Sequence, residues 1–128
     1  MIRIRPLLFV ALILVGAFAF GEAYNREVVV PVMQNNLAQI RAIGAGLEAM
    51  DYFALGKSFF SIADGMMKVL PMEPPKGEEA HWTATLTEVI NVAYLGVGAC
   101  GARYAAGVQD AFDRLRALMQ EGHGAHRP

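Results

Sequence analysis

The residues of this chain with the widest chemical range are its three histidines and its single cysteine. Glu78 and His81 stand three residues apart, as in one half of a di-iron carboxylate site, but the second half and the further inward glutamates of such a site are missing. His123 and His126 have the same spacing and could chelate a divalent metal, yet no carboxylate or thiolate is placed to close that site. Cys100 alone can form neither an internal disulfide nor a cysteine-based zinc site. We therefore expect no metal site.

The chain also lacks the motifs of common enzymes. No glycine-rich phosphate loop follows a strand pattern, and no nucleophile elbow or Ser/His/Asp set is present. Of its 128 residues, 55% are hydrophobic and 18% are charged, which is typical of one globular domain rather than of a disordered chain. The formal net charge of −1 gives no reason to expect a nucleic-acid partner. The sequence favours a non-enzymatic protein.

Four segments of the chain have apolar residues at helical spacing, and these predicted helices must position any functional side chain. They cover about 31–50, 52–70, 79–98 and 103–122. Four amphipathic helices of similar length, joined mostly by short links, predict an all-α, antiparallel four-helix bundle over residues 27–122. The residues expected to share one core are Leu37, Leu47, Phe59, Ile62, Leu86, Ile90, Phe112 and Leu115.

Caps and breakers mark the ends of these segments. Asp51 is a candidate N-cap of the second segment, and prolines between 71 and 75 with Gly77 make the one long link. Gly98 and Gly101 are expected to break the third segment. The glycine-rich tail, residues 123–128, is expected to fray.

The first twenty residues are a targeting element. Two arginines within residues 1–5 precede an apolar run over residues 6–20, and Ala17-Phe18-Ala19 fits a small-x-small cleavage site. These are the parts of a signal peptide, although the run could also remain as an N-terminal membrane anchor. Both alternatives place the body outside the cytoplasm, in the periplasm or beyond, with membrane contact through residues 1–20 if they are not cleaved.

The C-terminal run from Ala111 to Arg127, AFDRLRALMQEGHGAHR, resembles the last helix of the cytochrome c-prime family, the class II cytochromes c. That family ends on a helix bearing Cys-x-x-Cys-His and a short basic tail. His123 matches the proximal histidine, while Met119 and Gly122 stand at the two cysteine positions. The Pro-Pro-Lys-Gly loop at 74–77 and Trp82 also resemble the family, so the likeness covers about residues 27–127.

The resemblance implies a cytochrome c-prime-like bundle with a degenerate haem site. Covalent haem needs thioethers from cysteine sulfur, and neither Met119 nor Gly122 can form one. Non-covalent haem remains as an alternative, with His123 as one ligand and Met33 at the position from which some relatives supply an axial methionine. Such a pair suits electron transfer. As ordinary residues, Met33 would be core and His123 a cation at a helix C-terminus.

Two hypotheses follow from the resemblance. The first is a haem-free bundle with no cofactor, exported as a structural or accessory subunit that binds protein partners, for example within a membrane redox complex. The second is an electron carrier that holds haem non-covalently between His123 and Met33. Relatives often pair through their first two helices, so a homodimer is possible on the resemblance alone.

Overall fold

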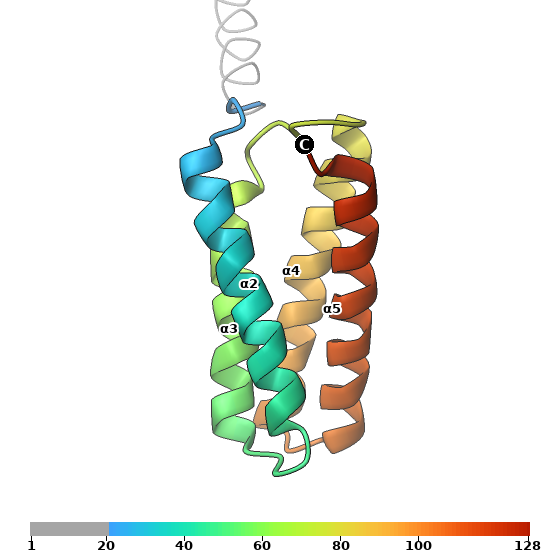
Figure 1. Ribbon diagram of the computed structural model, residues 1–128. Coiled ribbons are helices and arrows are strands. Elements are labelled where there is room, and N and C mark those ends of the chain that lie inside the picture. Colours follow the sequence, from blue (N-terminus) through green and yellow to red (C-terminus); the bar gives the residue numbers. More distant parts are fainter. Residues whose placement is uncertain (1–20) are drawn as a thin grey trace, which may run out of the picture.

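The computed structural model describes residues 21–128 as four helices and their links. The helices are α2 (Arg26–Gly46), α3 (Tyr52–Val69), α4 (Glu79–Gly101) and α5 (Ala105–His126). Successive helices run in opposite directions along one bundle (Figure 1). Within residues 21–128 there is no strand, only an isolated bridge between Glu22 and Met72. The all-helical, four-helix prediction is confirmed, while the expected signal or anchor, residues 1–20, lies outside the described residues.

Side-chain caps set the starts of the first two helices. The Asp51 carboxylate accepts a hydrogen bond from the Ala54 backbone N–H at 3.2 Å, so the expected N-cap of α3 is confirmed. Asn25 caps α2 in the same way, accepting from the Glu27 N–H at 3.0 Å. Because of this cap, α2 begins at Arg26, five residues before the expected start, and carries Pro31 inside it.

The expected break of the third segment at Gly98 is wrong. α4 continues through Gly98 to Gly101, and the chain then turns at Arg103, whose φ is +54°. The Tyr104 N–H donates to the Ala99 carbonyl at 2.8 Å, which closes this turn. Glycine weakens a helix but does not stop it where packing holds the flanking turns.

The expected fraying of residues 123–128 is also wrong for most of the tail. α5 continues to His126, and that side chain is only 3% exposed. The tail is ordered because tertiary hydrogen bonds hold its last side chain, as described below, and these offset the weak helix propensity of Gly122 and Gly124. The helical bundle therefore extends four residues beyond the expected boundary at 122.

The core matches the expected stripes with two exceptions. Phe59, Ile62, Leu86, Ile90, Phe112 and Leu115 are buried in one cluster. Leu47 is half-buried against it, and Leu37 is 51% exposed, so the prediction for Leu37 is wrong. The buried stripe of α2 is narrow and runs through Val29, Val32, Asn36 and Ile43. Leu37 lies about 100° around the helix from Asn36 and therefore falls outside that stripe.

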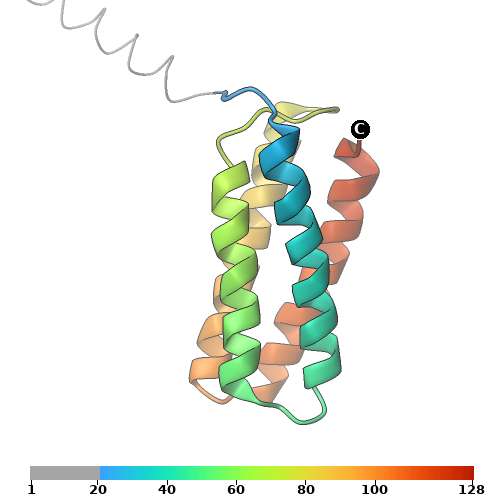
Figure 2. The same ribbon diagram turned by 60° about the vertical axis from the view of Figure 1, so that its left-hand side comes forward.

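α3 and α4 approach each other closely where Phe59 meets Gly96 (the two helices are labelled in Figure 1 and seen from another side in Figure 2). The Phe59 ring is fully buried against the backbone of Gly96. A Cβ atom built on Gly96 would lie 2.6 Å from Cγ of Phe59, well inside van der Waals contact. The Phe59 ring thus fills the space that a side chain at position 96 would occupy.

This packing predicts opposite effects for two glycine substitutions in one helix. Gly96→Ala should destabilise the fold by about 1–3 kcal/mol, because overlap with Phe59 outweighs the gain in helix propensity. Gly98→Ala is the matched control, since a Cβ there meets nothing within 4 Å. It should stabilise the fold by up to about 1 kcal/mol. Urea unfolding followed by circular dichroism measures both, and equal effects would contradict the close approach at Gly96.

Candidate functional site

The polar side chains that α4 and α5 bring together lie at the end of the bundle where the chain's C-terminus also lies (Figure 1). Nδ1 of His126 lies 2.7 Å from the carbonyl oxygen of Lys76, and its Nε2 lies 2.7 Å from Nδ1 of His81. Nε2 of His81 lies 3.1 Å from a carboxylate oxygen of Glu121. Four groups from the 71–78 link, α4 and α5 therefore form one hydrogen-bonded chain.

The protons of this chain can be assigned from its two outer partners. A carbonyl oxygen only accepts, so Nδ1 of His126 must carry a hydrogen; an ionised Glu121 requires the same of Nε2 of His81. The bond between the two rings needs a further hydrogen. Which ring nitrogen donates in that bond depends on the tautomers of the two imidazoles.

Tight packing encloses the buried end of this chain. The Trp82 ring meets the His126 ring edge to face, with 5.3 Å between centroids, and the Trp82 indole N–H donates to the Met72 carbonyl at 2.8 Å. Gly77 has a φ of +85°, and a Cβ there would lie 2.8 Å from both the Ala125 carbonyl oxygen and Nδ1 of His126. The long link therefore contacts the start of α4 and the end of α5.

The structure pairs the histidines differently from the two sequence motifs. Glu78 with His81 and His123 with His126 were each considered as local pairs. Instead, His81 and His126, one from each motif, contact one another, while His123 is exposed. The signal that could have found this pair is topological. The start of α4 and the end of the antiparallel α5 must meet at the same end of the bundle.

The positions that resemble a haem site are arranged around a filled core. Met33, Met119 and Gly122 are half-buried, and a Cβ on Gly122 would be in ordinary contact with Thr85. Asn36 is buried, and its amide nitrogen lies 3.0 Å from the sulfur of Met66 and 3.9 Å from that of Met33. The half-buried Met33 thus packs against the core beside Asn36.

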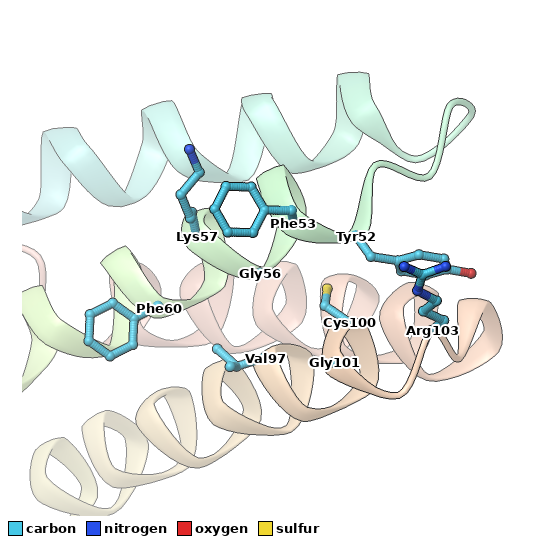
Figure 3. Close-up of a pocket in the computed structure, with 9 residues that line it drawn as sticks. All are labelled: Tyr52, Phe53, Gly56, Lys57, Phe60, Val97, Cys100, Gly101 and Arg103. Atoms are coloured by element: carbon cyan, nitrogen blue, oxygen red, sulfur yellow. The ribbon is translucent and has the colours of Figure 1, made fainter.

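Two hollows are found at the surface of the described residues. One, of about 250 Å³, is lined by Glu78, His81, Ala125 and His126 at the hydrogen-bonded end. The other, of about 650 Å³, lies between α3 and α4 at the opposite end (Figure 3). Neither is lined by Met33, Met119, Gly122 or His123. These two hollows therefore lie away from the four positions that resemble a haem site.

Cys100 lies at the floor of the larger hollow. It is buried, as its interpretation as a small apolar residue predicts, and burial raises the pKa of its thiol above the ordinary value. A thiol whose pKa is raised is a poor nucleophile near neutral pH. Cys100 therefore serves packing between α3 and α4.

The buried imidazole predicts a measurable cost of its removal. His126→Ala should lower the free energy of unfolding by about 1–3 kcal/mol, because it leaves the Lys76 carbonyl and the His81 ring without their partner. His123→Ala is the control on the same helix, and its exposed side chain should contribute within about 0.5 kcal/mol. Thermal unfolding compares the two variants, and amide exchange at Gly77 and Arg127 should accelerate in His126→Ala alone.

Comparison of the chain with models of protein families, with curated proteins and with solved structures finds no significant match in any of the three. The function must therefore be inferred from the residues of the chain itself.

Proposed function

We propose that this chain is a haem-free bundle of cytochrome c-prime-like type that acts as an exported accessory subunit. It binds protein partners, for example within a membrane redox complex, and performs no catalysis. The observation that carries the proposal is the state of the two candidate haem ligands: Met33 sulfur lies beside the buried Asn36, and His123 is exposed. A ligand pair for haem needs both side chains to face one shared volume.

The filling of the bundle supports the same reading. Met66, Phe59, Phe112 and Leu115 are buried in one core cluster, and the half-buried Met119 packs against it. Methionine adapts to irregular gaps, so its use here suits a bundle that closes around its own side chains. Opening a haem-sized apolar void instead would cost roughly 24 cal/mol for each Å³.

Export is part of the proposal and is argued from residues 1–20. Arginines before the apolar run and Glu22 after it favour the extracytoplasmic side for the body. Among the described helices, α4 is long and apolar enough to cross a membrane by length and composition, but 44% of that stretch is buried within the bundle. We therefore interpret α4 as a core helix of the bundle and keep residues 1–20 as the proposed targeting element.

A haem titration tests the haem-free role. The purified protein should show no Soret band, and added hemin should give the same weak, nonspecific absorbance in the unmodified protein, in His123→Ala and in Met33→Leu. His126→Ala belongs in the series as a control for imidazole ligation at the neighbouring turn. A stoichiometric Soret band that disappears in His123→Ala would instead establish the electron carrier with ligands His123 and Met33.

The N-terminus is tested by the intact mass of the chain recovered from its host. The expected result is either removal of about 19 residues, at the site after Ala19, or retention of the full chain in the membrane fraction. Recovery of the full-length chain from the soluble cytoplasm would contradict export.

A further inference from the structure

α3 carries a second apolar face that the bundle does not bury. Its inner face consists of Leu55, Phe59, Ile62, Ala63, Met66 and Val69. The outer face presents Phe53, Lys57, Phe60, Asp64 and Met67, and we call these five residues the α3 seam. Phe53 is 76% exposed, Phe60 54% and Met67 51%. Three large apolar side chains in solvent on one helix face mark an interaction surface.

The spacing of the seam is that of helix pairing. Its members follow one another at intervals of four, three, four and three residues. This alternation keeps all five on one stripe when two helices pack along their lengths, because it averages 3.5 residues per step. The inner face of α3 packs in the bundle, so the seam is available to a helix from another molecule.

A hollow beside the seam gives a second helix room. The hollow of about 650 Å³ lies between α3 and α4, with Phe53, Lys57 and Phe60 on one wall. Val97 and Gly101 form the α4 side (Figure 3). Lys57 packs over the Phe53 ring, 4.8 Å from its centroid, so its stem covers apolar surface while its charge stays at the rim.

The charges of the seam select its partner. Lys57 and Asp64 are its two charged members, seven residues or about 10.5 Å apart on α3. Phe60 lies near the midpoint between them, and Phe53 and Met67 lie at the two ends. An antiparallel copy of the same helix would therefore set each Lys57 opposite an Asp64 and each Phe53 opposite a Met67. A parallel copy would set like charges together, which is unfavourable.

We propose that two copies of this chain associate through their α3 seams, antiparallel, about a two-fold axis near Phe60. A surface that complements itself in this way is the requirement for a closed, symmetric dimer. The family resemblance implies pairing through the first two helices together, of which α3 is the second, whereas this proposal rests on the α3 seam alone. Self-association through α3 also does not depend on whether the bundle binds haem, so the two proposals can fail separately.

The antiparallel arrangement has a consequence for the N-terminus. The segment before α2 lies at the same end of the bundle as the C-terminus (Figures 1 and 2). Antiparallel α3 helices place the two copies' residue 21 at opposite ends of the dimer. Two such ends cannot both enter one bilayer, so this dimer requires removal of residues 1–20 and pairs with the signal-peptide alternative.

Charge reversal tests the pairing on the protein as recovered from its host. By sedimentation equilibrium, Lys57→Asp should weaken the dimer about ten-fold, because two carboxylates then face each other at both symmetry-related contacts. Asp64→Lys should weaken it by a similar factor through paired ammonium groups. The double variant, with both charges exchanged, should restore the dissociation constant to near the original.

Controls separate the seam from general surface effects. Phe60→Asp should abolish the dimer, whereas Leu37→Asp, at a similarly exposed apolar residue on α2, should leave it unchanged. Circular dichroism confirms that each variant stays folded, since all four positions are exposed. The proposal is overturned if the unmodified protein remains monomeric at its highest soluble concentration. It is also overturned if the double variant fails to recover, or if residues 1–20 are retained in the membrane.

Discussion

The fit of Phe59 against Gly96 is the contact on which the rest of this bundle depends. It lets α3 and α4 approach more closely than two helices with side chains at the crossing could. Small residues continue along the same interface, where Gly56 faces Cys100 and a Cβ on Gly56 would lie 3.4 Å from that of Cys100. The rotation of α3 that buries Phe59 also turns the neighbouring Phe60 outward, about 100° around the helix. The inner packing therefore determines which face α3 presents to solvent.

The end of the bundle that holds the 71–78 link and the C-terminus is stabilised by hydrogen bonds rather than by apolar contacts alone. The link between α3 and α4 is rich in proline, and its carbonyl groups need partners because they belong to no helix. Trp82 and His126 supply them at Met72 and Lys76. The segment before α2 joins the same end, since the Glu22 N–H donates to the Pro71 carbonyl at 3.0 Å. This polar cap brings the N-terminal segment, the long link and the end of α5 into one unit.

The sequence predicted the features that arise within single helices. The four segments, the Asp51 cap and most of the buried stripes depend on local periodicity and capping, which a sequence displays directly. Leu37 was misjudged because the width of a buried stripe depends on how many neighbours a helix has. The end of α5 was misjudged because the partner of His126 is the Lys76 carbonyl, 50 residues away. A hydrogen bond to a backbone atom has no signature in residue type.

The same distinction between local and tertiary features applies to the candidate site. Under the proposed family resemblance, residue types alone argue against covalent haem, since neither Met119 nor Gly122 can form a thioether. They could not show that His81 and His126 would share a hydrogen bond, because that contact needs two helix ends to meet. The α3 seam was visible in the sequence only as extra apolar residues, since Phe53, Phe60 and Met67 also read as core.

The polar end and the side of the bundle therefore suit different roles in the proposed subunit. The polar cap holds the segment before α2 against the 71–78 link, through the hydrogen bond from the Glu22 N–H to the Pro71 carbonyl. The α3 seam lies along the side of the bundle and carries the exposed apolar surface, so association extends sideways. In an antiparallel pair, α2 and α5 remain outside the α3–α3 contact and stay available to other proteins. A haem-free bundle built this way would serve as a bridge, with its own copy on one side and the complex it supports on the other.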